Sequence, residues 1–116
     1  MTEQIVEDWG LLREVLQSEN VSGDTYKLAR TAVEVGALLV RKNQDYGSSG
    51  MKRPVLMPSI SPRQALLCRM SDKVARIAEL SAGTDPAVRD ESLEDTIRDL
   101  AGYCILWLTA GDKNEQ

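Results

Sequence analysis

Residues 61–83, SPRQALLCRMSDKVARIAELSAG, predict a helix with both of its ends marked. Ser61 is a preferred N-cap residue, Pro62 suits the first helical position, and Gln64 completes a capping box. Gly83 suits the left-handed conformation in which many helices end. Between these ends, apolar residues recur at three- and four-residue steps, the spacing of a helix that buries one face: Leu66, Met70, Val74, Ile77 and Leu80.

The same spacing predicts three more helices on either side of this one. The first covers about residues 3–18. The next starts near Asp24, a good N-cap residue, and frays over residues 43–47. The last begins near residues 90–92 and runs to about Ala110.

A loop over about residues 46–61 is rich in glycine and proline, which suits neither a helix nor an interior strand. Loops of this length are uncommon in compact domains, and the sequence leaves a functional lid and a disordered segment as alternatives. The elements together predict a single all-α domain over residues 1–116. Its predicted architecture is a four-helix antiparallel bundle with one long loop between the second and third helices.

The composition restricts both the core and the partners. Aromatic residues make up 4% of the chain and Phe is absent, so we expect an aliphatic core. The net charge of −4 argues against a nucleic-acid polymer as partner, because phosphate contacts need a basic surface. No apolar run is long enough to span a bilayer, so we expect no membrane partner and a cytoplasmic protein. Cys68 and Cys104 lie in apolar helical patterns and are expected to be buried thiols.

Three carboxylates, Glu91, Asp95 and Asp99, follow one another at four-residue steps, so they project from one side of the last predicted helix. Stacked like charges repel one another and need compensation by basic groups or by a hard cation. The chain has no His, so carboxylates are its natural metal ligands, and Mg²⁺ binds such oxygens together with substrate phosphates. In an enzyme, one of these acids would serve as general base.

Each of these acids also has a structural interpretation. Glu91 and Asp95 lie in the first helical turn, where acids favour the positive end of the helix dipole, and Asp95 forms a capping box with Ser92. Asp99 lies beyond capping range beside apolar residues, so it needs a partner. The basic side chains that can serve in place of a metal are Arg98, Lys73 and Arg76.

The helix with two marked ends carries a stripe of alternating charge, Arg69, Asp72, Arg76 and Glu79. Such a stripe is typical of a salt-bridged surface helix. In a functional site, Asp72 would join the acidic cluster as a metal ligand. Phosphate would then be bound by Arg69, Lys73 or Arg76.

Residues 42–47, KNQDYG, lie where the second predicted helix ends. Lys42 and Gly47 also have a purely structural interpretation, because a cation in the last turn and a glycine after it are common at helix C-termini. The segment nevertheless offers a cation, an amide, a carboxylate and a phenol that can bind the base or sugar of a substrate: Lys42, Asn43, Asp45 and Tyr46.

Three segments carry a family resemblance: residues 42–47 (KNQDYG), 69–76 (RMSDKVAR) and 90–103 (DESLEDTIRDLAGY). They resemble a phage and prophage family called the nucleotide-modification-associated domain, whose pattern is roughly KNxDYG, RxxDKxxR and ESxxDTxxDLAxY. The resemblance covers about residues 25–108 and leaves residues 1–20 as an accessory N-terminal helix. It implies a phage-type, nucleotide-handling protein in the cytoplasm of a bacterial host cell.

That family is distantly similar to the MazG-type all-α nucleoside triphosphate pyrophosphohydrolases. The similarity implies a MazG-like fold with Mg²⁺ held between carboxylates of two helices, and hydrolysis between the α- and β-phosphates. Glu91, Asp95 and Asp99 match the acidic helix of that arrangement as metal ligands and catalytic residues. The facing helix departs from the MazG pattern, because it has Asp72 and Glu79 where those enzymes carry a Glu-rich motif.

Three functions fit these residues. The first is a Mg²⁺-dependent nucleotide pyrophosphohydrolase or a related nucleotide-processing enzyme. The second is a module that binds or sequesters a nucleotide without turning it over, and the third is a helical protein-interaction adaptor. A homodimer or higher homo-oligomer is also expected, because residues 100–108 are apolar nearly all round and Trp107 is a candidate interface anchor.

Overall fold

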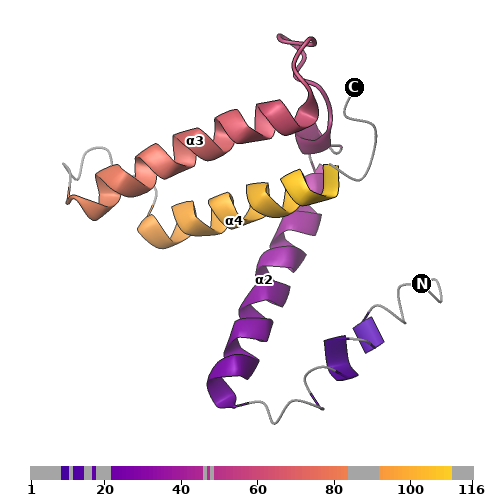
Figure 1. Ribbon diagram of the computed structural model, residues 1–116, viewed down its shortest axis with the longest axis vertical. Coiled ribbons are helices and arrows are strands. Elements are labelled where there is room, and N and C mark those ends of the chain that lie inside the picture. The colour runs from indigo at the N-terminus through magenta and orange to yellow at the C-terminus, as the bar shows by residue number, and fades with distance from the viewer. Residues whose placement is uncertain are drawn as a thin grey trace. The chain divides into compact units, whose positions relative to one another are not determined.

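The computed structural model describes residues 9–10, 12–14, 17, 22–45, 47, 49–83 and 92–110. Its main elements are the helices α2 (Gly23–Asp45), α3 (Pro62–Ser81) and α4 (Leu93–Ala110), which are labelled in Figure 1, and the short 3₁₀ helix η1 (Ser49–Met51). The described ranges contain no strand, which confirms the predicted all-α fold.

Helix α3 has the two ends that its sequence predicts. The Ser61 hydroxyl accepts a hydrogen bond from the Gln64 backbone N–H at 3.1 Å, and the Gln64 side chain accepts one from the Ser61 N–H at 2.9 Å. Pro62 occupies the first turn, and Gly83 has a φ of 73°, in the left-handed region. The capping box and the glycine stop are therefore confirmed.

Hydroxyl caps also begin the other two helices. The Thr25 N–H donates to the Ser22 hydroxyl at 3.2 Å, so the N-cap of α2 is Ser22 and the expected cap at Asp24 is wrong. Asp24 lies instead within the first turn, where a carboxylate still favours the helix dipole. At α4, the Asp95 N–H donates to the Ser92 hydroxyl at 3.0 Å, as expected for a cap at Ser92.

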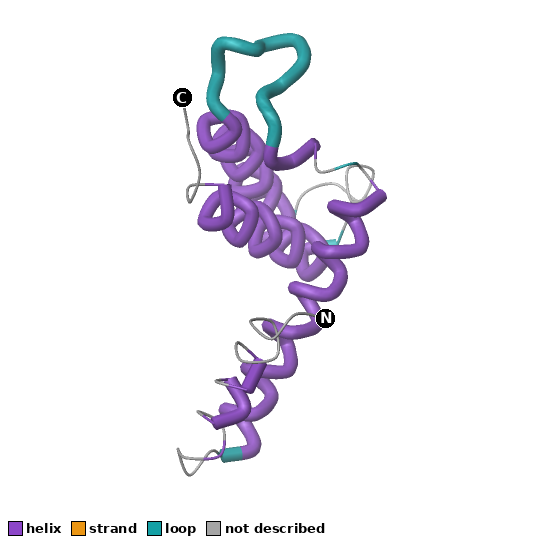
Figure 2. Tube along the Cα trace, turned by 90° about the vertical axis from the view of Figure 1, so that its right-hand side faces the viewer, coloured by secondary structure: helices purple, strands orange, loops and turns teal. Residues whose placement is uncertain are grey.

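Helices α3 and α4 lie antiparallel and pack against each other (Figure 1 and Figure 2). Leu66 and Thr96 are fully buried, and the Thr96 hydroxyl is satisfied because it donates to the Ser92 carbonyl at 2.9 Å. Near the other end of α4, the Arg63 guanidinium lies 3.6 Å from the centroid of the Trp107 ring and donates to the Trp107 carbonyl at 3.2 Å. The antiparallel packing expected of a bundle is thus confirmed for this pair of helices.

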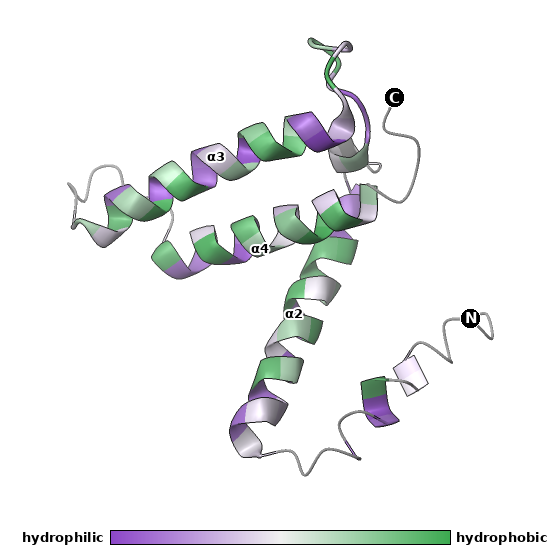
Figure 3. Ribbon diagram, in the orientation of Figure 1, coloured by the Kyte–Doolittle hydropathy of each residue, from purple (hydrophilic) through white to green (hydrophobic). Residues whose placement is uncertain are grey.

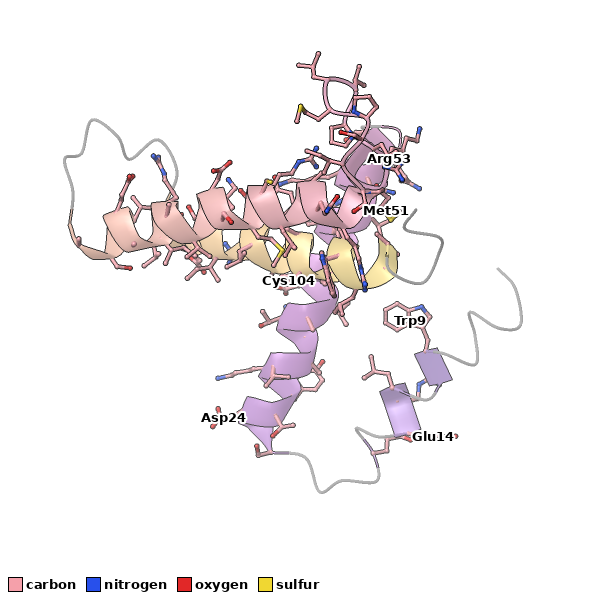
Figure 4. The ribbon with its side chains drawn as sticks, turned by 45° about the horizontal axis from the view of Figure 1, so that its top comes forward. Trp9, Glu14, Asp24, Met51, Arg53 and Cys104 are labelled. Carbon is pink, nitrogen blue, oxygen red and sulfur yellow. The ribbon has the colours of Figure 1, made fainter. Side chains whose placement is uncertain are left out.

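The connection between α2 and α3 is built from consecutive turns. After η1, the Met57 N–H donates to the Pro54 carbonyl, and the Ile60 N–H donates to the Met57 carbonyl. A guanidinium N–H of Arg53 reaches the Pro58 carbonyl at 3.2 Å. Figure 2 shows this segment as a loop beyond the helices, and the side chains of Met51 and Arg53 are labelled in Figure 4. Described residues 49–61 therefore have defined turns.

The two cysteines differ from expectation. Cys68 is exposed and Cys104 is half-buried. Cys68 follows the buried Leu66 by two residues, which places it on the other side of α3. Helical spacing within an apolar pattern therefore did not guarantee burial, because α3 buries only the side that meets α4.

The chain divides into two compact units, Met1–Glu34 and Val35–Gln116. In the first, residues 9–10, 12–14 and 17 are helical, in agreement with the helix expected over residues 3–18, whose other residues lie outside the described ranges. The second unit holds the C-terminal half of α2 together with η1, α3 and α4. Among the described helices, none is long and apolar enough to cross a bilayer.

Candidate functional site

A cavity of about 340 Å³ lies within the unit Val35–Gln116. The C-terminal half of α2 and the middle of α4 supply most of its walls, and η1 and α3 contribute one residue each. Its volume is near the lower end of the range for small-molecule sites, roughly 300–1,000 Å³. The lining residues are Val35, Leu38, Leu39, Lys42, Asn43, Gly50, Arg69, Arg98, Asp99, Gly102, Tyr103 and Leu106.

The charged side chains of the pocket are mostly positive. Lys42, Arg69 and Arg98 contribute three positive charges and Asp99 contributes one negative charge, which leaves a net charge of +2. The whole chain carries a net charge of −4, so the pocket is positive on a negative molecule. Charges of one sign in a concave site concentrate ligands of the opposite sign. The pocket is therefore suited to an anion.

Asp99 is held between two lysines from different helices. Its Oδ2 lies 3.1 Å from Nζ of Lys73 on α3, and its Oδ1 lies 3.6 Å from Nζ of Lys42 on α2. The sequence predicted that Asp99 needs a partner and offered Lys73 as one candidate, which the structure confirms. Lys42 is a second partner that sequence spacing did not indicate. The carboxylate thus orients two ammonium groups at the wall of the pocket.

Arg98 turns part of its guanidinium toward two acids of its own helix. It lies 2.8 Å from Glu94 and 3.6 Å from Asp95, at the four- and three-residue spacings that favour such pairs. The Asp95 side chain is largely exposed. Within the described residues, Asp95 therefore lies beside an arginine on the surface of α4, and it does not line the pocket.

Two glycines allow the backbone to approach the pocket closely. A Cβ atom on Gly50 would lie 3.3 Å from Cδ1 of Leu106 and 3.9 Å from a terminal nitrogen of Arg69. A Cβ atom on Gly102 would lie 3.5 Å from Cδ1 of Leu39, where α2 meets α4. The first contact is tighter than a normal van der Waals contact, so a larger residue at position 50 would displace the Leu106 side chain, which also lines the cavity.

The remaining lining is apolar and aromatic. Leu39 and Leu106 provide aliphatic surface, and Tyr103 and Asn43 add a phenol and an amide. Leu39 was not predicted as a site residue, although the helical period of α2 contained the signal. Leu39 precedes Lys42 by three residues, so both lie on the same side of α2.

The structure brings several of the predicted site residues together and leaves others apart. Those that line the pocket are Lys42, Asn43, Arg69 and Asp99, and Lys73 reaches it through its ion pair with Asp99. Those that do not line it are Asp45, Asp72, Arg76 and Asp95. Tyr46 and Glu91 lie outside the described residues.

The carboxylates predicted as Mg²⁺ ligands are only partly described. No group of three or more acidic or cysteine side chains suited to a metal ion occurs in the part of the chain that the structure describes. Both oxygens of Asp99 face an ammonium group, which opposes a second cation at the same carboxylate. Because Glu91 is outside the described ranges, the predicted set of Asp72, Glu91, Asp95 and Asp99 stays a prediction.

Residues 42–110 match the family model for Nucleotide modification associated domain 1. The match begins at Lys42 of the pocket and includes η1, α3 and α4. No curated protein matches the chain. No solved structure matches it either, so the likeness to MazG-type enzymes stays a prediction. Since the matched residues cover more than half of the chain, this protein belongs to the Nucleotide modification associated domain 1 family.

Proposed function

We propose that this protein binds a nucleotide in the cationic pocket. The observation that carries the proposal is the net positive lining of a cavity of about 340 Å³ on an acidic chain. The family to which the chain belongs is associated with nucleotide modification, which supports a nucleotide over other small anions. The cavity volume suits a mononucleotide better than a polymer, and the acidic surface disfavours a nucleic-acid backbone.

The phosphate end of the ligand would be bound by the basic side chains. Arg69 comes from α3 and Lys42 from α2, so phosphate binding would connect two helices. Arginine binds phosphate oxygens through two parallel N–H groups, and lysine adds a mobile point charge. Asp99 would act as a positioning residue, because it holds Lys42 and Lys73 in place without contacting the anion.

The base or sugar would lie against the uncharged part of the lining. Leu39 and Leu106 offer an apolar surface, Tyr103 offers a ring for stacking, and Asn43 offers both a donor and an acceptor for a base edge. This division into a charged end and an apolar end with a few polar groups is typical of small-molecule sites. Which base is bound would be decided by Asn43 and Tyr103.

A Mg²⁺-dependent pyrophosphohydrolase is the second candidate, and Asp99 at the pocket wall is the observation that favours it. In that function the nucleotide would still occupy the same pocket. The two candidates differ in what Asp99 does: it is a metal ligand in the enzyme and a partner of two lysines in the binding module. The two functions can therefore be separated by the metal dependence of binding.

Titration calorimetry of the full chain with nucleoside mono-, di- and triphosphates tests the proposal, in EDTA and separately in Mg²⁺. We expect binding in EDTA that weakens with added salt, because the interaction is electrostatic. Binding that requires Mg²⁺, together with release of pyrophosphate from a labelled triphosphate, would favour the enzyme instead. Absence of binding by every nucleotide in both buffers would overturn both candidates.

A matched pair of variants locates the site. Arg69→Ala removes a cation that lines the pocket, whereas Lys27→Ala removes an exposed cation on the first half of α2, outside the lining. We expect Arg69→Ala to weaken nucleotide binding about tenfold or more, which corresponds to a lost hydrogen bond between charged groups. Lys27→Ala should leave the affinity unchanged. Equal effects of the two variants would place the site elsewhere.

A further inference from the structure

One side of α4 carries an apolar stripe that contains no charged residue. The stripe consists of Leu93, Ile97, Ala101, Cys104 and Leu108, at steps of four, four, three and four residues. Leu93, Ile97 and Leu108 remain 37%, 48% and 63% exposed. Apolar side chains at this spacing form the seam along which one helix packs against another.

The stripe lies on the side of α4 that faces away from the pocket. Gly102 and Leu106, four residues apart, line the pocket, whereas Ala101 and Cys104 are displaced from them around the helix. Nucleotide binding therefore does not explain the stripe. Cys104, near the middle of α4, is labelled in Figure 4.

Helix α3 extends this apolar surface. Leu67 and Trp107 of α4 line the same shallow depression, near the start of α3 and the end of α4. Val74 follows Leu67 by seven residues and so lies on the same side of α3. Both are about half exposed, and Figure 3 shows apolar bands along both helices. The apolar surface thus spans two helices.

The described residues leave much of this apolar surface exposed. Leu66 is the only buried hydrophobic side chain in the described ranges. A domain of this length normally buries roughly two-thirds of the surface that its unfolded chain exposes. A large contiguous apolar patch that stays exposed on a monomer marks an interaction site. A further layer is therefore needed on this side of α3 and α4.

We propose that a second copy of this chain supplies that layer, with the two α4 helices antiparallel across a two-fold axis. Four of the stripe's five residues have the symmetry that such an axis requires: from Ile97 to Leu108 the steps are four, three and four residues, the same read from either end. Leu93 lies outside this symmetric part. With the axis between Ala101 and Cys104, each Ile97 meets the other copy's Leu108, and each Ala101 meets the other copy's Cys104.

This arrangement is isologous and closes on itself as a dimer. The smaller residues lie at the crossing point and the larger ones at the ends, which lets the two helices approach closely. With α3 of each copy beside it, the pair of α4 helices becomes the centre of a four-helix bundle. The alternative cover for this surface is the apolar side of the helix expected over residues 3–18. That helix needs no symmetry in the stripe, and it would leave the protein a monomer.

Sedimentation equilibrium of the full chain tests the dimer. We expect a dimer for the wild type and at least about a tenfold larger dissociation constant for Leu108→Glu, since a charge at the seam is left without a partner. The matched control is Leu28→Glu, which alters a leucine on α2 that is 71% exposed and outside the stripe. A monomeric wild type would overturn the proposal. So would a dimer that responds equally to both variants.

A disulfide trap tests the register even if Leu108→Glu fails to fold. In one helix, residues three apart have Cβ atoms about 5–6 Å apart. A disulfide needs a Cβ–Cβ distance of about 3.5–4.5 Å, so the new cysteine of an Ala101→Cys variant cannot form a disulfide with Cys104 of its own chain. In a Cys68→Ser background, which removes the exposed thiol of α3, we expect mild oxidation of this variant to give a covalent dimer that disappears when Cys104→Ser is added. The control Ala37→Cys, at an exposed position of α2, should not give it. A covalent dimer that survives Cys104→Ser, or none at all, would overturn the register.

Discussion

The ammonium nitrogen of Lys73 lies 3.1 Å from Oδ2 of Asp99, which joins α3 to α4 at the wall of the pocket. The other oxygen of Asp99 lies 3.6 Å from Nζ of Lys42 on α2. These side chains are between 22% and 49% exposed, so solvent screens each pair and limits it to about 1 kcal/mol or less. The chief effect of the carboxylate is therefore to set where two cations lie.

Replacing Asp99 by Asn separates anion binding from metal binding. In the binding module, Asp99→Asn releases Lys42 and Lys73 from the carboxylate that positions them, so nucleotide affinity in EDTA should persist but fall by up to about fivefold, the scale of an exposed charge pair. In a Mg²⁺ site, the same change should abolish metal-dependent binding. Calorimetry with and without Mg²⁺ measures both effects. The control is Asp45→Asn, which alters an exposed acid that does not line the pocket. It should change neither the affinity in EDTA nor the metal-dependent binding.

Enlarging Gly50 should narrow the pocket. In Gly50→Ala the new methyl group lies 3.3 Å from Cδ1 of Leu106, so this side chain must shift, and both residues line the cavity. We expect weaker nucleotide binding and a loss of stability below about 1 kcal/mol, because the flexible end of a side chain yields more easily than a packed core. Calorimetry and urea unfolding measure the two quantities.

Gly36→Ala is the control for that substitution. A Cβ atom at Gly36 meets nothing within 4 Å, and the position lies inside α2. Alanine loses less backbone entropy than glycine when a helix forms, so the variant should gain about 0.5–1 kcal/mol of stability. Its nucleotide affinity should match the wild type. An affinity loss as large as that of Gly50→Ala would show that the contact with Leu106 is not the cause.

Removing the α3 cap should destabilise the protein. Ser61→Ala deletes the hydroxyl that accepts from Gln64, so one N–H of the first turn loses its partner at a cost of about 1 kcal/mol. Ser71→Ala is the control, because the Ser71 hydroxyl donates a hydrogen bond to the Leu67 carbonyl of the same helix and caps no helix end. Urea unfolding should give a clear decrease for the first variant and little change for the second; the reverse order would contradict the capping role.

The contact between Arg63 and Trp107 should be visible by fluorescence. Arg63→Ala removes the cation stacked on the indole, at a cost of about 1 kcal/mol, and exposes the ring to water. In a Trp9→Tyr background, which leaves one tryptophan, we expect a shift of the emission to longer wavelength. Arg30→Ala breaks only an exposed pair with Glu34 and should leave emission and stability unchanged. An unshifted spectrum in Arg63→Ala would contradict the stacking.

Local chemistry made the helices predictable. The ends of α3 depend on Ser61, Gln64 and Gly83, which interact only with backbone a few residues away. The start of α2 was misplaced for a related reason: Ser22 and Asp24 are both good N-cap residues, and only backbone geometry selects between them. The loop after α2 contained too many breakers for its turns to be assigned from the chain alone.

By itself, therefore, the sequence determined the all-α fold, the ends of α3, the start of α4 and the family, because these depend on periodicity and short-range contacts. Only the tertiary structure decided which charges meet. Asp99 has Lys73 and Lys42 as neighbours because three helices pack at one place, whereas Asp95 on the same predicted acidic stripe lies beside Arg98. Helical spacing specifies the side of a helix on which a residue lies, but not what faces that side. The packing of α2 and α3 against α4 supplies the neighbours, and it places cations around Asp99.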